Sequence, residues 1–433
     1  MSAIALLMGL LLLSYVGSLI VGGRSAKGLP SGVEFIGLGF AVGPHALGLV
    51  ERSMIAEFEP LVQVALGWLA FVVGLDFSRV AGRRVRARSM LLGVFCALLT
   101  GATVAFAVNR LLAYMPIAGL DGKNAWLFAA GAGAVTAETT RFVVQWVAVR
   151  WAVKGPISSL LVELAASDDL APLVAAGAIF AFAPSSSVAL EMPAGGWFLL
   201  SLALGALLGT VTALLLRGAE GYAVWGALIG TLLLGVGAAT RLGLCTIFVT
   251  FVMGIALGGV SPNRRVLRKL VSPTERAVLY PMLLLAGAHL DARPLMENRM
   301  LIAVVALALL ARIVGKLLSG VVVRATVPAS RPAGPLLGIV LLSSGPVSVS
   351  CGFVFALRFP GPFGDTLLVC AAASAVLGEL ISTFALKSML TQLGELTLPP
   401  PPGPAVPPPP PSVPEPRSSE RSLVVADDAE EPS

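Results

Sequence analysis

Charged residues are scarce in this chain. Only 12% of its 433 residues are Asp, Glu, Lys or Arg, whereas soluble globular proteins carry about 25%. With 56% hydrophobic residues and a mean hydropathy of +0.89, the chain is expected to be an all-α polytopic membrane protein. The net charge of +6 does not indicate nucleic-acid binding, because the basic residues of a membrane protein belong mostly to its cytoplasmic loops.

Motifs of soluble enzymes and of fixed metal sites are also missing. The sequence has no P-loop, no GxGxxG in a βαβ setting and no HExxH. Its four cysteines lie far apart in apolar runs, without metal-ligand spacing. We therefore predict that the protein is not an enzyme and carries no cofactor and no resident metal.

About thirteen apolar segments are long enough to cross a bilayer. The tenth is short, and only Arg241 separates the eighth from the ninth, so a count that differs by one stays open. The first is interpreted as a retained span, because no basic residue precedes it and no cleavage site stands out. The segments cover residues 3–22, 29–50, 60–77, 89–113, 125–149, 157–183, 195–216, 221–240, 242–260, 276–291, 300–323, 333–357 and 365–386.

The basic residues between the segments are concentrated in every second loop, with a few scattered bases in the others. Under the positive-inside rule they predict a multi-pass protein of the cell membrane with its N-terminus outside and its C-terminus in the cytoplasm. The loops predicted outside hold mainly acidic residues, such as Glu51, Glu57, Glu59, Glu191 and Glu297. The inside loops hold Arg24, Lys27, Arg79, Arg83, Arg84, Arg86, Arg88, Arg150, Lys154, Arg217, Arg264, Arg265, Arg268, Lys269, Arg276, Arg324 and Arg331.

The C-terminal segment differs in composition from the rest. From about Pro399 it is rich in proline and then in acidic residues, a composition that cannot form a hydrophobic core. It is predicted to be a disordered cytoplasmic extension. Binding of a partner protein to its polyproline stretch is an open alternative.

Small residues interrupt two of the predicted spans. The fifth span contains GAGAVTAETTR (Gly131–Arg141), and the twelfth contains LLSSGPVSVS (Leu341–Ser350). Each is the middle member of a triplet, spans four to six and spans eleven to thirteen, and the two triplets have opposite orientation. Broken segments at corresponding positions of two halves are typical of an inverted-repeat transporter. The pattern therefore predicts a substrate site near the membrane midplane, where the two broken helices cross.

Two adjacent carboxylates, Asp168 and Asp169, lie in the middle of the sixth span. A single charged Asp at the centre of a membrane helix costs about 2.5–3.5 kcal/mol on insertion scales. The pair therefore needs a basic partner, a proton or a bound cation, which points to ion translocation. Arg312 and Lys316 lie one helical turn apart in the eleventh span, and either can approach the pair. A lysine is the better switch, because burial changes its charge more readily.

Other ionisable residues within the spans have alternative interpretations. Asp76, followed by Arg79 at a helix end, is expected to lie at the membrane interface. Glu138 and Arg141 are i,i+3 neighbours and could pair with each other. Glu379, in the last span, could pair with Arg312.

Seven segments, in order along the chain, resemble the monovalent cation/proton antiporters, the sodium/proton exchanger superfamily. The resemblance covers about residues 5–390 and is carried by the order and spacing of the segments. Among them are the aspartate motif AASDDLAPLV and the unwound segment AGAVTAETTRFVVQ. The segments are Gly28–Leu49, Leu66–Val80, Ala132–Gln145, Ala165–Val174, Tyr280–Asp291, Gly315–Gly320 and Leu341–Val349.

The resemblance implies a core of two crossed broken helices and a separate dimerisation domain. The protein is then expected to be a homodimer that works by alternating access in the lipid bilayer. The core would comprise residues 89–185 and 293–390, and the dimerisation helices residues 1–88 and 219–292. Residues 186–218 would form a linking helix, and residues 391–433 the Pro-rich tail.

The resemblance also implies roles for individual residues. Asp169 matches the ion-binding carboxylate, and Asp168 matches its neighbour. Lys316 matches the lysine that pairs with the aspartates, although a one-turn shift would place Arg312 there. Glu138 departs from the family pattern by adding a carboxylate. The remaining matches are polar or small residues of the two broken helices: Thr136, Thr139, Ser343, Ser344 and Gly345.

These observations predict an antiporter that exchanges protons for Na⁺, Li⁺ or K⁺ at the aspartate pair. One alternative is an organic-anion symporter on the same fold, which would need an excess of basic charge near the breaks. Another is a transport-dead sensor or scaffold that recruits a partner through its tail. A gated channel is disfavoured, because the site is predicted to be occluded and charge-coupled.

Overall fold

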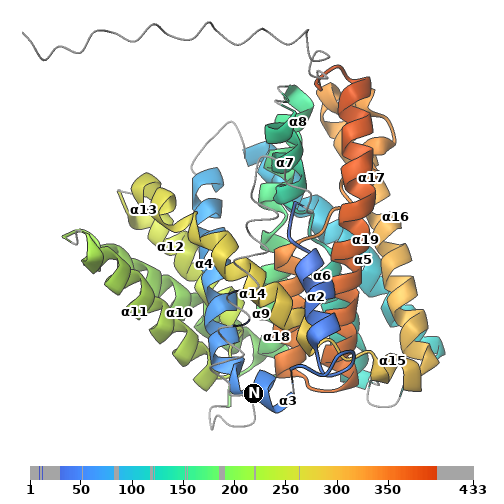
Figure 1. Cartoon of the computed structure of the whole chain (residues 1–433). Helices are drawn as coiled ribbons and strands as arrows, with labels where there is room; N and C mark the ends of the chain where they lie inside the picture. The colour runs from blue at the N-terminus through green and yellow to red at the C-terminus, as the bar shows by residue number, and fades with distance from the viewer. Residues whose placement is uncertain are drawn as a thin grey trace, which may run out of the picture. The chain divides into compact units, whose positions relative to one another are not determined.

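The computed structural model describes residues 9, 12, 30–50, 52–81, 87–117, 120, 122–151, 153, 155–184, 191–218, 221–262 and 264–396. Every regular element among these residues is a helix (Figure 1). The first predicted span, apart from two isolated residues, and the tail beyond Leu396 lie outside this part of the chain.

Each of the other twelve predicted spans corresponds to one helix or to a pair of helices. Seven of the described segments are long and apolar enough to cross a membrane, with α8 and α9 counted as one. The helices are α2 (Glu34–Val42), α4 (Glu59–Ala81), α5 (Ala87–Tyr114), α6 (Gly122–Thr136), α7 (Arg141–Arg150), α8 (Pro156–Ser167), α9 (Leu170–Phe182), α10 (Ala194–Leu215), α11 (Tyr222–Arg241), α12 (Thr246–Val260), α14 (Thr274–His289), α16 (Arg299–Thr326), α17 (Leu336–Val340), α18 (Pro346–Arg358) and α19 (Pro362–Gln392).

Four short elements were not predicted from hydropathy, because they are too short or too polar to cross a bilayer. Among them, α13 carries four basic residues on a short amphipathic helix. The short elements are α3 (Arg52–Glu57), α13 (Arg264–Val271), α15 (Arg293–Glu297) and the 3₁₀ helix η2 (Pro328–Ala333).

The second predicted span, residues 29–50, is much shorter as a helix than expected. The helix α2 has nine residues. Before it, Gly32 adopts a positive φ of 74° directly beneath the ring of Tyr280, where a side chain would collide. After it, Gly43 precedes Pro44, and a proline disfavours helical backbone in the residue before it. A prediction from hydropathy does not take account of these two constraints on the backbone.

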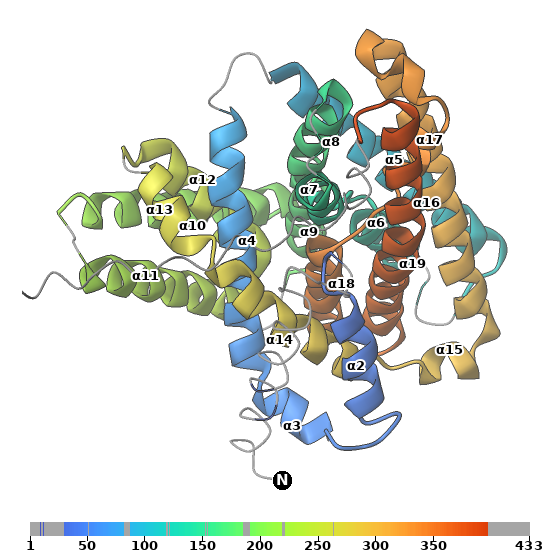
Figure 2. The same ribbon diagram turned by 45° about the horizontal axis from the view of Figure 1, so that its top comes forward.

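The predicted repeat appears as two sets of helices that interlock. One set is α5, the broken pair α6–α7 and the pair α8–α9, and the other is α16, the broken pair α17–α18 and α19. The outer helices α5 and α16 pack against each other, with Gly315 against the backbone of Thr100. The two breaks meet, because the backbone N–H of Thr140 donates to the carbonyl of Ser343 at 3.2 Å. Figure 2 shows these helices on one side of α4.

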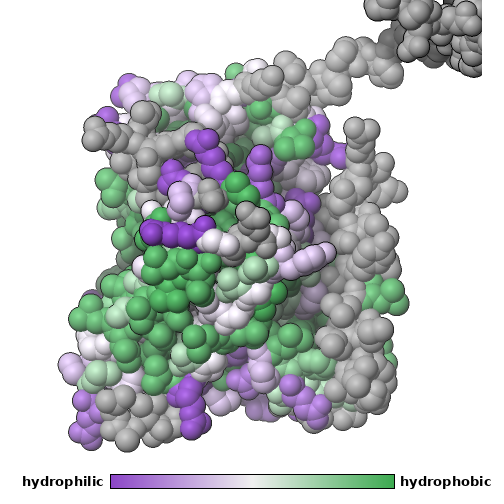
Figure 3. Space-filling view, turned by 90° about the vertical axis from the view of Figure 1, so that its left-hand side faces the viewer, coloured by the Kyte–Doolittle hydropathy of each residue, from purple (hydrophilic) through white to green (hydrophobic). Residues whose placement is uncertain are grey.

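The helices α10, α11, α12 and α13 lie on the other side of α4 (Figures 1 and 2). Close packing depends on glycine here: Gly74 of α4 and Gly254 of α12 each face a backbone carbonyl of the opposite helix. Small residues at such contacts let membrane helices approach closely. Figure 3 shows hydrophobic side chains gathered in the middle of the face that these helices present, with hydrophilic ones toward its ends. The division into a core and a dimerisation domain remains a prediction.

Substitution of Gly254 by Leu is expected to separate α4 from α12. A Cβ at this position would overlap the carbonyl of Phe71, which as backbone cannot move aside. Overpacking of this kind costs about 1–3 kcal/mol or more. The purified Gly254→Leu protein should therefore unfold at a clearly lower temperature than the wild type in the same detergent.

The control is Gly226→Leu on α11, where an added Cβ meets nothing within 4 Å. Equal unfolding temperatures for the two variants would contradict this account of the packing.

Candidate functional site

The first break lies between α6 and α7, over residues 137–140. The hydroxyl of Thr140 accepts from the backbone N–H of Phe142 at 3.4 Å and so caps α7. The hydroxyl of Thr139 donates to the carbonyl of Leu341 at 3.2 Å, within the second break. Backbone groups that leave a helix inside a membrane must find partners in the protein. Each break therefore supplies partners for the other.

Arg312 of α16 binds both breaks at once. Its Nε donates to the carbonyl of Thr136 at 2.8 Å, and its Nη2 donates to the carbonyls of Glu138 at 3.2 Å and Ser343 at 3.3 Å. The guanidinium is buried, and its fixed fork of donors suits several acceptors at once. Arg312 does not form the predicted pair with Glu379, whose Oε1 instead accepts from the backbone N–H of Ser31 at 2.8 Å.

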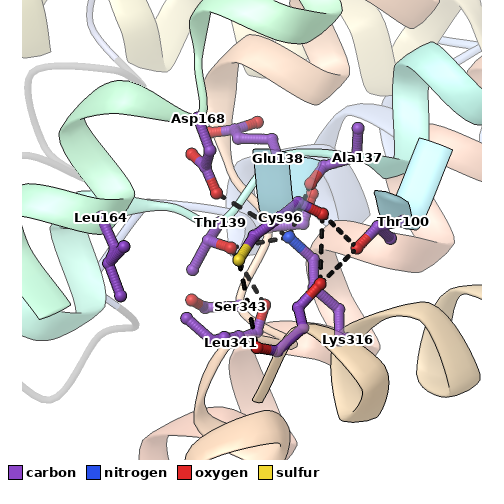
Figure 4. Close-up of polar contacts among 12 residues, drawn as sticks. Cys96, Thr100, Ala137, Glu138, Thr139, Leu164, Asp168, Lys316, Leu341 and Ser343 are labelled. Carbon is purple, nitrogen blue, oxygen red and sulfur yellow. Dashed lines mark hydrogen bonds and ion pairs between the residues drawn. The ribbon is translucent and has the colours of Figure 1, made fainter. Parts of the chain in front are cut away.

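Lys316 lies one turn further along α16 and reaches the aspartate pair. Its Nζ donates to the carbonyl of Ala137 at 2.6 Å and to the hydroxyl of Thr139 at 2.7 Å. It also lies 3.8 Å from Oδ2 of Asp168. Figure 4 shows the ammonium group pointing at all three partners. The sequence left the choice between Arg312 and Lys316 open, and in the structure Lys316 makes the ion pair.

Asp168 and Asp169 occupy a turn that divides the sixth span into α8 and α9. Pro172 has no N–H to donate to the carbonyl of Asp168, and this carbonyl accepts instead from Ala171 at 3.3 Å. Both carboxylates are buried, 3% and 4% exposed. One oxygen of Asp168, Oδ1, has no hydrogen-bond partner among the described residues. The sequence identified the pair but not the turn that holds it.

Glu138 lies in the first break and is also buried. Its carboxylate accepts a short hydrogen bond from the backbone N–H of Ser348, in the first turn of α18. A carboxylate at a helix N-terminus is stabilised by the helix dipole. Gly345, at the end of the second break, faces the first break, and a Cβ there would collide with Thr140. Glu138 therefore links the two breaks instead of pairing with Arg141.

The hydroxyl groups predicted for the site take different positions. The Thr136 hydroxyl donates to the carbonyl of Ala132 on its own helix at 2.7 Å, so Thr136 contacts the site through its carbonyl group. The Ser344 hydroxyl donates to that of Ser348 at 2.8 Å. The Ser343 hydroxyl is buried without a hydrogen-bond partner in the described part of the chain.

Arg141 belongs to a partly buried ion cluster that the sequence did not predict. It pairs with Asp76 of α4 at 2.7 Å and with Glu275 of α14 at 2.8 Å. Asp76 also pairs with Arg268 of α13. The possible pair of Glu138 with Arg141 is therefore not made in this structure, and the expected position of Asp76 at the membrane interface stays a prediction. Spacing along one helix could not reveal partners on three other helices.

A cavity of about 20 Å³ lies between the aspartate pair and this ion cluster. Its lining includes Glu138, Thr140, Arg141, Asp169 and Glu275. A space of this size is large enough for a single water molecule, and by size for a bare monovalent cation. Asp169, and not Asp168, is the member of the pair that lines it.

A second cavity of about 380 Å³ lies at the other end of α14. Both histidines of the chain line it, and Nε2 of His45 lies 3.4 Å from Oδ1 of Asp291. Neither aspartate of the pair lines this cavity. Of these two cavities, the smaller one therefore borders the pair.

The charges around the breaks do not balance. Three buried carboxylates, Glu138, Asp168 and Asp169, face two buried bases, Arg312 and Lys316. The neighbouring cluster is balanced, because Arg141 and Arg268 face Asp76 and Glu275. With all groups ionised, the crossing therefore lacks one positive charge. One added positive charge would balance it.

Comparisons with known proteins agree with this geometry. The family model for the transmembrane region of sodium/hydrogen exchangers matches residues 9–392. A structure of the sodium proton antiporter MjNhaP1 from Methanocaldococcus jannaschii at pH 8 superposes with a TM-score of 0.66 at 14% identity. It covers 91% of this chain and 98% of the antiporter.

A second structure of the same antiporter, from electron microscopy, gives a TM-score of 0.57 at 17% identity. It covers 91% of this chain and 99% of that one. No curated protein sequence matches the chain significantly. The solved structures show a shared fold, and the family model covers most of the chain. The chain belongs to the sodium/hydrogen exchanger family.

Proposed function

We propose that this protein exchanges a monovalent cation, Na⁺, Li⁺ or K⁺, for protons across the cell membrane, and that both compete for the aspartate pair. Family membership supports cation/proton antiport in general. The observation that carries the specific proposal is the missing positive charge at the crossing, next to a cavity of about 20 Å³.

Asp169 is the proposed carrier, because its side chain lines the cavity. Its carboxylate holds either a proton or a dehydrated cation. Carboxylate, hydroxyl and carbonyl oxygens are the ligands that hard cations prefer, and Glu138 and Thr140 supply such oxygens in the cavity wall. Asp168 modulates the site, because its charge is already opposed by Lys316 at 3.8 Å.

Competition of the cation and the proton for one carboxylate is enough to couple the transport of one to that of the other. An unbalanced charge is expensive to move through the membrane interior, so the crossing moves only when a cation or a proton neutralises it. The cavity beside Asp169 is lined by Glu275 at the start of α14, next to Arg276, in the region that the distribution of basic residues assigns to the cytoplasm. We therefore assign the structure to an inward-facing state, with the N-terminus outside and the C-terminus inside.

The alternatives fit the site less well. An organic-anion symporter would need an excess of basic groups, and the crossing has an excess of one carboxylate. A transport-dead scaffold would not need a water-sized cavity beside a buried carboxylate. In the proposed homodimer, the apolar face over α10 and α11 would be the surface that packs against the second copy (Figure 3).

Replacing Asp169 by Asn removes the proposed carrier while preserving its shape. In proteoliposomes that contain a pH-sensitive dye, addition of Na⁺, Li⁺ or K⁺ should dequench the dye with the wild type. The Asp169→Asn protein should show no signal above empty liposomes. The control is Glu297→Gln on the exposed helix α15, which should transport like the wild type. Robust transport by the Asp169→Asn protein would refute the assignment.

Loss of Arg312 should mainly lower the stability of the protein, whereas loss of Lys316 should mainly change its transport. Arg312→Gln leaves three buried carbonyls without their charged donor, which should destabilise the fold by about 3 kcal/mol or more. Lys316→Gln should destabilise the fold less than Arg312→Gln does, because it removes the donor of one carbonyl instead of three. It should keep part of the transport and change the pH dependence or stoichiometry of transport. Unfolding temperatures and dye-based transport assays measure the two effects. The reverse pattern, with a stable Arg312→Gln protein and an unfolded Lys316→Gln protein, would contradict these roles.

A further inference from the structure

Glu379 is a buried carboxylic acid that belongs to none of the contacts around the two breaks. It lies in the middle of α19 and is 0% exposed. Its Oε1 accepts a hydrogen bond from the backbone N–H of Ser31 at 2.8 Å. Its Oε2 has no hydrogen-bond partner in the described part of the chain, and the same holds for the neighbouring hydroxyl of Ser31. The Ser31 hydroxyl interacts with the carboxyl group of Glu379, but neither it nor Oε2 has a well-formed hydrogen bond among the described residues, an arrangement that native proteins avoid.

The charged groups around Glu379 do not neutralise it. On α2 it faces Glu34, another carboxylate. On α14, the ring of Tyr280 packs against Gly32, next to Ser31, and Arg276 acts on Tyr280 without forming an ion pair with Glu379. On α16 the guanidinium of Arg312 approaches the adjacent Gly378, but its hydrogen bonds go to backbone carbonyls. The neighbouring helix α17 has no titratable side chain. Among the described residues, no Lys or Arg forms an ion pair with Glu379.

A proton resolves both problems at once. A carboxylate without a base is expensive inside a membrane protein, and a neutral acid is not. A protonated carboxyl group is also a donor, so a proton on Oε2 of Glu379 can be shared with the Ser31 hydroxyl. Glu34 in the first turn of α2 already supplies the negative charge that favours a helix start.

The position of Glu379 joins two parts of the fold. Next to it on α19, Gly378 packs directly against the carbonyl of Leu342 in the second break. Ser31 precedes α2, which packs along α14 through Gly39 and Gly287. A movement of the crossing relative to α2 and α14 would therefore change the surroundings of Glu379.

We infer that Glu379 binds a proton at the contact between α19 and the start of α2, at a site separate from the aspartate pair. The part of this proton in transport rests on the proposed function, whereas its presence at Glu379 does not. The site takes a proton and not a metal cation, because a dehydrated cation needs more oxygen ligands than this contact provides.

Infrared spectroscopy of the purified protein near neutral pH tests the inference without a transport assay. A protonated carboxyl group has a C=O stretching band that is distinct from the bands of a carboxylate and shifts in D₂O. The wild type should show such a band, and the Glu379→Gln protein should lack the component that Glu379 contributes to it. The matched control Glu297→Gln should keep the band. Identical spectra of the wild type and the Glu379→Gln protein would overturn the inference.

A second variant keeps the test decisive if Glu379→Gln does not fold. Ser31→Ala removes the acceptor of the proposed O–H donor, so the band should remain and move in frequency. An unchanged frequency would overturn the proposed hydrogen bond and with it the site.

The Asp169→Asn protein separates the two proposals. It should keep the Glu379 band while it loses transport. Transport by this variant with the band present would refute only the proposed carrier. Loss of transport together with spectra that do not depend on Glu379 would overturn only the second proton site.

Discussion

The fold depends on one cluster of contacts, in which two bases of α16 hold the crossing of two broken helices. A broken helix exposes carbonyl groups that water cannot satisfy at this depth. Arg312 donates hydrogen bonds to three of these carbonyls, from both breaks. Lys316 donates to the carbonyl of Ala137 and lies beside Asp168. The bases therefore stabilise the backbone and oppose the carboxylates at the same time. Since they leave one carboxylate unbalanced, the contacts that stabilise the fold also create the proposed cation site.

Much of this architecture could be predicted from the sequence, because it depends on local composition. Apolar length located twelve described spans, runs of small residues located both breaks, and the cost of a buried charge singled out Asp168 and Asp169. The partners of Arg141 could not be predicted, because Asp76 and Glu275 reach it from α4 and α14, and pairing across helices leaves no pattern along the chain. The hydrogen bonds of Arg312 could not be predicted either, because its acceptors are backbone carbonyls, which every residue has.

Two further contacts connect the broken helices to the rest of the protein. The Arg141 cluster joins α7 to α4, α13 and α14, and the Glu379–Ser31 contact joins α19 to the start of α2. Both are polar and at least partly buried, and both lie where the repeat helices meet α2, α4 and α14. In alternating access, such contacts must break and re-form, and packed interfaces of this kind tend to switch between discrete arrangements. The site and its mobile boundaries are therefore built from the same few ionisable residues.

The central claim is that a cation and a proton compete for Asp169. It is tested most directly by adding Na⁺, Li⁺ or K⁺ to the purified protein in weakly buffered detergent solution, and measuring cation binding by calorimetry and proton release with a pH electrode. The account predicts that protons are released as the cation binds, that the apparent Kd rises as the pH is lowered, and that the Asp169→Asn protein shows neither effect. Cation binding without proton release, with an apparent Kd independent of pH, would contradict the account.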